Sequence, residues 1–110
     1  MIARDENKCY LMIVLPASCR VDLATLRRVT GRPHLELADE AASAALFPDC
    51  EMGAMPPFGN LYGLEVYVDA CIPRNRPIVF QAGNHHEAVR IAFRDYQWAV
   101  KPFVTEFCHH

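Results

Sequence analysis

Two short glycine-containing segments carry the residue types best suited to hold a polar ligand. The first runs from Gly53 to Gly59 and includes Pro56 and Pro57, so two glycines and two prolines fall within seven residues. Such a segment follows a rigid path and can offer backbone N–H groups to a ligand. The second is the segment 83–86, Gly-Asn-His-His, which can place an imidazole at the mouth of a pocket. The alternative for both is an ordinary turn, since glycine and proline are common in turns.

Positive charge gathers in the segment between residues 20 and 34. Its basic side chains are Arg20, Arg27, Arg28, Arg32 and His34. Arginine binds phosphate well, so this segment is a candidate for contact with a nucleic-acid backbone. The alternative is a solvated surface, because exposed arginine is common. The net charge of −2 at pH 7 argues against a protein that binds nucleic acid by overall charge alone.

The five cysteines form no ligand or disulfide pattern. None is at Cys-x-x-Cys spacing, and their positions are Cys9, Cys19, Cys50, Cys71 and Cys108. The spacing therefore predicts neither a disulfide framework nor a zinc site. Cys50 lies between Asp49 and Glu51, whose charges disfavour a thiolate, so thiol catalysis is not indicated. We interpret the last segment, 108–110, as a frayed end or a tag remnant.

The elements that position these segments belong to one small domain. The chain has 110 residues, of which 52% are hydrophobic and 22% charged, which is enough for one core and too few for two domains. The longest apolar run covers seven residues, 9–15, far below the roughly 20 that span a bilayer. No basic stub followed by an apolar stretch opens the sequence, so a soluble, cytoplasmic protein is expected.

Hydrophobic periodicity and turn residues predict strands interspersed with helices. Strands are expected at 10–15, 34–37, 64–69, 78–82 and 88–92. Helices are expected at 22–30, 39–47 and 93–100. Strand 64–69 alternates apolar and polar residues, which is typical of a half-buried strand, and segment 49–61 is an irregular loop. Because some strands are consecutive, the order predicts an α+β fold with a mixed sheet.

Four stretches, in consistent order, resemble the YbaK family, which comprises relatives of the editing domain of bacterial prolyl-tRNA synthetase. They are 14–18, 20–23, 46–59 and 79–85. The similarity runs from about residue 10 to residue 101. The Gly-x-x-x-Pro element at Gly53 and Pro57 and the Gly-x-His element at Gly83 and His85 resemble the substrate-loop motifs of that family.

This resemblance implies a single editing domain over residues 1–110, short at its N-terminus, with a mixed, barrel-like β-sheet flanked by helices. It implies a free-standing deacylase that hydrolyses the ester between a mischarged small amino acid and tRNA. No metal and no cofactor are implied, because the terminal ribose hydroxyl assists and loop amides hold the reacting carbonyl. The implied partner is mischarged tRNA, with an aminoacyl-tRNA synthetase as a second candidate partner.

The resemblance also assigns roles to residues. Gly53 is the expected catalytic position, and the expected substrate contacts are Ala54, Met55, Pro56, Pro57, Phe58, Gly59, Gly83 and His85. The expected tRNA contacts are Arg20, Arg27, Arg28 and Arg32. Active relatives carry a lysine whose place falls just before residue 1 here, so lower activity is expected. A catalytically silent tRNA or aminoacyl-adenosine binding module on the same fold is the competing function.

Overall fold

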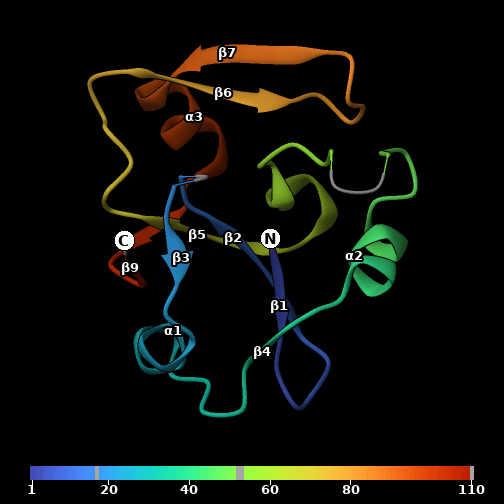
Figure 1. Ribbon diagram of the computed structural model, residues 1–110, viewed down its shortest axis with the longest axis vertical. Coiled ribbons are helices and arrows are strands. Elements are labelled where there is room, and N and C mark those ends of the chain that lie inside the picture. The colour runs from blue at the N-terminus through green and yellow to red at the C-terminus, as the bar shows by residue number, and fades with distance from the viewer. Residues whose placement is uncertain (17, 52–53, 110) are drawn as a thin grey trace.

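The computed structural model describes residues 1–16, 18–51 and 54–109, which form an α+β domain (Figure 1). Its strands are β1 (Ile2–Arg4), β2 (Tyr10–Val14), β3 (Arg20–Val21), β4 (Glu36–Leu37), β5 (Glu65–Asp69), β6 (Pro77–Gln81), β7 (Ala88–Ala92), β8 (Phe103–Thr105) and β9 (Cys108–His109). Its helices are α1 (Leu23–Thr30), α2 (Glu40–Leu46), α3 (Phe93–Val100) and the 3₁₀ helix η1 (Gly59–Tyr62). No helix of these ranges is long and apolar enough to cross a bilayer.

Within the described ranges, five strands form a central mixed sheet in the order β4-β1-β2-β5-β8. β1 runs antiparallel to β2 and β4, whereas β5 runs parallel to β2 and β8. The pairs β3–β9 and β6–β7 are separate two-stranded sheets. The predicted α+β class is therefore confirmed. The ladders among the described residues do not join into one closed barrel, so the barrel-like arrangement is open.

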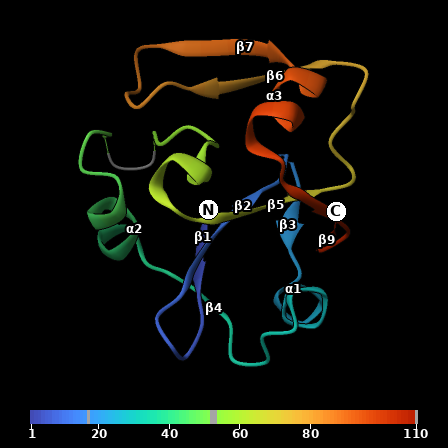
Figure 2. The same cartoon turned by 180° about the vertical axis from the view of Figure 1, so that it is seen from behind.

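The central sheet is buried on both faces because its inner strands carry nearly continuous apolar runs. On β2, Met12 belongs to one core together with Tyr96 of α3. Its neighbours Leu11 and Ile13 belong to a second core together with Leu26 of α1. Figure 2, seen from behind, shows α1 at one end of the molecule and the β6–β7 hairpin at the other. One face of the sheet thus packs against α3, and the other face packs against α1.

The expectation that segment 64–69 is half-buried is wrong. Residues 66–69 are all buried, including Tyr67 and Asp69 at the positions expected to face solvent. Tyr67 packs in the second core, and its ring stacks on Phe103 of β8 with centroids 5.0 Å apart. Asp69 is buried because its carboxylate accepts backbone hydrogen bonds. Alternation of polar residues therefore did not mark a solvent face here.

Helix boundaries follow the capping residues that the sequence shows. Asp22 accepts a hydrogen bond from the backbone N–H of Thr25 at 3.2 Å, and Gly31, with φ of 68°, ends α1. Asp39 caps α2 in the same way. The predicted helices are confirmed, whereas β1, β3, β8 and β9 were missed because they are only two or three residues long. The frayed-end interpretation is wrong for residues 108 and 109, which pair with β3; residue 110 lies outside the described residues.

Gly59 packs closely against β2 and β5. A Cβ atom at this position would lie 3.0 Å from Cβ of Met12 and 3.1 Å from Cγ2 of Val66. We expect Gly59→Val to lower the free energy of unfolding by about 1–3 kcal/mol, because buried backbone and side chains must move apart. Denaturant titration measures this change. Leu61→Ala, an exposed position in the same 3₁₀ helix, serves as the control with an expected change of about 0.5 kcal/mol or less. Equal effects of the two substitutions would contradict the close packing.

Candidate functional site

The two glycine-containing segments found in the sequence lie against each other. The backbone N–H of Gly83 donates to the carbonyl of Ala54 at 2.9 Å, and the carbonyl of Gly83 accepts from the N–H of Glu51 at 2.7 Å. Gly83 has a φ of 95°, a conformation that favours glycine. Gly83, which follows β6, therefore holds the residues on both sides of segment 52–53. That segment, with the predicted catalytic position Gly53, lies outside the described residues.

The loop that follows, residues 54–59, is held by aromatic side chains. The hydroxyl of Tyr96 donates to the carbonyl of Pro57 at 2.6 Å. The ring of Phe58 packs edge-on against Phe80 and Tyr96, with centroids 5.5 and 5.4 Å apart. Burial raises the pKa of Tyr96 well above its usual value, so the phenol stays protonated at neutral pH and can donate. The loop therefore has one fixed path from Ala54, which is buried, to η1.

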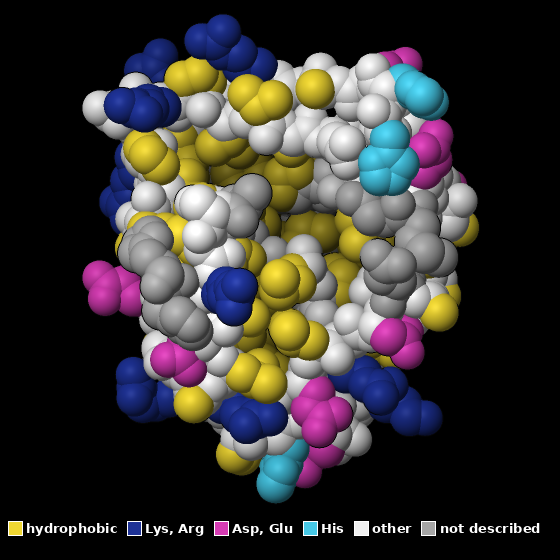
Figure 3. Space-filling view, viewed as in Figure 1, with side chains coloured by type: hydrophobic (Ala, Val, Ile, Leu, Met, Phe, Trp, Pro, Cys, Tyr) yellow, Lys and Arg dark blue, Asp and Glu magenta, His cyan; other side chains and the backbone are white. Residues whose placement is uncertain are grey.

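A cavity of about 620 Å³ lies between this loop, β6, α3 and the central sheet. Figure 3 shows it as a hollow with a hydrophobic floor below the β6–β7 hairpin. Its volume is within the range of small-ligand sites. Hydrophobic side chains from several elements make up most of its wall, among them Met12, Val14, Met55, Pro57, Val68, Ile78, Phe80 and Phe93. The loop and β6, the strand that leads to Gly83, thus line one cavity, whereas Gly83 and His85 themselves do not.

Arg76 is the one charged side chain among the described residues that line the cavity. It lies in the turn that leads into β6 and is exposed. No described carboxylate, imidazole or lysine side chain lines the wall. Arg76 is not among the site residues predicted from the sequence. The available signal was the proline-flanked turn 73–77 directly before a predicted strand.

Of the predicted substrate contacts, Met55 and Pro57 line the cavity, whereas Ala54, Pro56, Phe58, Gly59, Gly83 and His85 do not. His85 is exposed, and its backbone N–H donates to the carboxylate of Glu51 at 3.3 Å. Gly59 faces β2. The corner between β6 and β7 is held by Asn84, whose Oδ1 accepts from the backbone N–H groups of residues 86 and 87, both at 2.8 Å. The corner is therefore a fixed turn.

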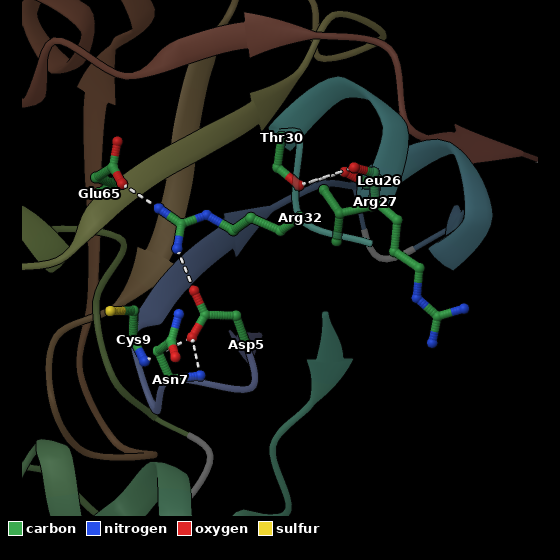
Figure 4. Close-up of polar contacts among 8 residues, drawn as sticks. All are labelled: Asp5, Asn7, Cys9, Leu26, Arg27, Thr30, Arg32 and Glu65. Atoms are coloured by element: carbon green, nitrogen blue, oxygen red, sulfur yellow. Dashed lines mark hydrogen bonds and ion pairs between the residues drawn. The ribbon is translucent and has the colours of Figure 1, made fainter. Parts of the chain in front are cut away.

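The predicted tRNA contacts differ in their surroundings. The guanidinium of Arg32 forms ion pairs with Asp5 and with Glu65, the latter at 2.9 Å (Figure 4). Arg27 donates through Nε to the carbonyl of Leu35 at 2.8 Å, and its guanidinium points away from the Arg32 ion pairs. Arg20 on β3 and Arg28 on α1 are exposed. Arg32 thus ties three segments together, whereas the others present charge to solvent.

Three cysteines that the sequence left unrelated meet beside the cavity. Sγ of Cys71 lies 3.7 Å from Sγ of Cys19 and 3.3 Å from Sγ of Cys108. Cys19 also lines the cavity. Burial raises the pKa of Cys71, and raises that of Cys108 to about 11, so neither thiol is an activated nucleophile at neutral pH. Sequence spacing could not show this cluster, because 52 and 37 residues separate its members.

Over residues 1–98 the sequence matches the protein family described as the aminoacyl-tRNA editing domain. No curated protein matches it significantly. Among solved structures, a hypothetical protein superposes with a TM-score of 0.87 and 17% identity, over 99% of this chain and 71% of that chain. A proposed trans-editing enzyme for prolyl tRNA synthetase superposes with a TM-score of 0.85 and 18% identity, over 100% of this chain and 68% of that chain. A protein from Marinobacter aquaeolei VT8, described as a candidate signal transduction protein, superposes with a TM-score of 0.83 and 15% identity, over 99% of this chain and 24% of that chain. At these identities the structures show a shared fold.

Proposed function

Because the chain belongs to the aminoacyl-tRNA editing domain family, we propose that it hydrolyses the ester linking a mischarged small amino acid to the terminal adenosine of tRNA. The observation that supports this most is the cavity, whose wall includes Met55 and Pro57 of the loop and the strand leading to Gly83. The solved structure described as a proposed trans-editing enzyme for prolyl tRNA synthetase has the same fold. We place this activity in the cytoplasm, with mischarged tRNA as the partner and a synthetase as the candidate source of that tRNA.

The chemistry of the cavity suits an aminoacyl-adenosine end. A small amino acid side chain and the flat faces of adenine favour an apolar wall, and the neighbouring phosphate favours a single cation at the rim. Arg76 provides that cation in our proposal. His85, at the corner behind the loop, would influence which amino acid is accepted.

Hydrolysis in this cavity relies on backbone donors. Water attacks the ester carbonyl, the bond to the ribose oxygen breaks, and a free amino acid and an uncharged tRNA end are released. The backbone N–H of Met55 makes no hydrogen bond to a described residue, and its side chain lines the cavity. We assign this N–H, together with that of Gly53, to the developing oxyanion, where one such donor can contribute about 3 kcal/mol. The proton lost by the attacking water passes through the adjacent ribose hydroxyl to the ribose oxygen that leaves, so the step needs no side-chain base.

The lack of a carboxylate, imidazole or lysine side chain among the described lining residues supports the second candidate, a silent module that binds aminoacyl-adenosine without cleaving it. Both candidates require the cavity to bind the ligand. A test of this shared requirement uses an alanyl-adenosine analogue whose ester oxygen is replaced by NH. We expect it to bind with a measurable Kd by calorimetry and to lose affinity about tenfold or more in Ile78→Trp, which fills the cavity wall.

Val89→Trp is the matched control, because Val89 lies on the partner strand β7 and does not line the cavity. It should leave the affinity for the analogue unchanged. Binding that survives Ile78→Trp, or that is lost equally in both variants, would place the ligand elsewhere and remove the basis for either candidate.

Binding of tRNA should depend on Arg27 and Arg28 of α1. We expect the double substitution Arg27→Ala, Arg28→Ala to weaken binding to all tRNAs alike and to reduce the slope of log K against log salt by about two. Filter binding across a salt series measures both quantities. Arg32→Ala is the control: it should lower the free energy of unfolding more than it lowers tRNA affinity, because Asp5 and Glu65 already neutralise that guanidinium. An unchanged affinity in the double variant at low salt would show that α1 is only a solvated surface.

A further inference from the structure

The cysteine cluster comes from three separate parts of the chain. Cys19 precedes β3, Cys71 follows β5, and Cys108 lies on β9. Their Sγ atoms all lie within 4.8 Å of one another. The two measured separations, 3.7 and 3.3 Å, are longer than the about 2.05 Å of a disulfide bond. They are close to the about 3.8 Å that separates two sulfur atoms bound to one tetrahedral zinc ion at about 2.3 Å each.

The backbone around the cluster is held in place by hydrogen bonds. Asp69, at the end of β5, accepts from the backbone N–H of Cys71 at 2.8 Å. Its second oxygen accepts from the N–H groups of Phe107 and Cys108 at 2.8 and 2.9 Å. β9 is also paired with β3, where Val21 lies opposite Cys108. Two strands and one buried carboxylate thus fix the positions from which the thiols project, as a preformed metal site requires.

Charge also favours a cation at this point. Three thiols that can give up their protons to a metal ion lie beside the carboxylate of Asp69, which accepts from the backbone N–H groups of Cys71 and Cys108 at 2.8 and 2.9 Å. Their mutual repulsion would disfavour three bare thiolates, and a bound divalent ion would remove it. Soft sulfur ligands in a set of three select zinc and similar ions over magnesium or calcium.

We propose that Cys19, Cys71 and Cys108 bind one zinc ion, with a water molecule as the fourth ligand on the exposed side of Cys71. Binding exchanges up to three thiol protons for the metal: one Zn²⁺ and three thiols give a trithiolate zinc complex and three released protons. The site joins the turn after β5 to the strands β3 and β9 beside the cavity. Its role is structural, since it stabilises the folded state by binding it in preference to the unfolded chain.

The test uses the full chain, reduced and stripped of metal, with Co²⁺ and Zn²⁺ as probes. One equivalent of Co²⁺ should give the visible bands of tetrahedral cobalt and a thiolate charge-transfer band, and Zn²⁺ should abolish both. Zn²⁺ should also raise the Tm. Cys71→Ser and Cys108→Ser should each weaken Zn²⁺ binding about 100-fold or more, measured by competition with a chromophoric chelator, while circular dichroism checks that each variant folds.

Two controls distinguish zinc bound by the cysteine cluster from zinc bound elsewhere on the chain. Cys9→Ser and Cys50→Ser remove thiols outside the cluster and should leave Zn²⁺ affinity unchanged. The double substitution His109→Ala, His110→Ala should keep the thiolate band, which excludes binding by the terminal histidines alone. The proposal is overturned if Cys71→Ser and Cys108→Ser bind Zn²⁺ as tightly as the wild type. A second result would also overturn the proposal. The protein purified without reductant would be lighter by two hydrogens, because Cys71 and Cys108 form a disulfide, and the reduced protein would bind no Zn²⁺.

Discussion

Gly83→Val is expected to lower kcat/KM for deacylation by about 100-fold or more, the loss that a displacement of about 1 Å can cause at a reacting centre. Gly83 has a φ of 95°, which a β-branched residue adopts only with strain. Its N–H donates a hydrogen bond to Ala54, and its carbonyl accepts one from Glu51. These two residues flank the part of the loop that holds the ester in the proposed mechanism. Single-turnover deacylation of mischarged tRNA measures the effect.

Gly31→Val is the matched control for strain. Gly31 also has a positive φ, 68°, but it ends α1 far from the hairpin, and a Cβ there would meet no atom within 4 Å. This variant should lose stability comparably and keep its kcat/KM. If both variants lost activity to the same extent, the effect of Gly83→Val would reflect general destabilisation and not the loop.

Asp69→Ala is expected to lower the free energy of unfolding by about 3–5 kcal/mol at neutral pH, because buried N–H donors lose a charged acceptor. The donors belong to Cys71, Phe107 and Cys108, so the C-terminal segment should detach first. Denaturant titration in the presence of a chelator measures the change, and hydrogen exchange locates it. Asp95→Ala, at an exposed position on α3, is the control and should change stability by about 0.5 kcal/mol or less. Equal effects would contradict the role of Asp69.

The same carboxylate gives a pH dependence with a defined sign. Burial alone would raise the pKa of Asp69, but hydrogen bonds from the Cys71 thiol and from backbone N–H groups lower it from 3.8 to about 2. A carboxyl group whose pKa is lower in the folded state adds stability above its unfolded pKa. About 2 kcal/mol should therefore be lost as the pH falls from about 4 to about 2. Asp69→Ala should not show this loss.

Local signals in the sequence were sufficient for the helices and the longer strands. Asp22 and Gly31 mark the ends of α1 through capping chemistry that acts within a few residues. The glycine motifs likewise pointed to two segments that the structure brings into contact. Such features need no knowledge of distant parts of the chain.

Features that depend on distant pairing could not be predicted. β8 and β9 are short, and only their pairing with β5 and β3 makes them strands. The burial of Asp69 follows from N–H donors that lie 38 and 39 residues later in the chain. Arg76 became a candidate only when the cavity placed its turn at the rim. In each case the deciding partner is far away in sequence and near in space.

Release of labelled amino acid from tRNA tests the proposed function most directly. The substrates are tRNAs mischarged with alanine, serine or cysteine, compared with correctly charged tRNAs, and the proteins are the wild type, Ile78→Trp and Gly83→Val. We predict that the wild type accelerates release from at least one mischarged tRNA about tenfold or more over spontaneous hydrolysis, and that both variants lose this acceleration. A folded wild type that binds the amide analogue and yet leaves every release rate at the spontaneous value would contradict the deacylase and identify a silent binding module.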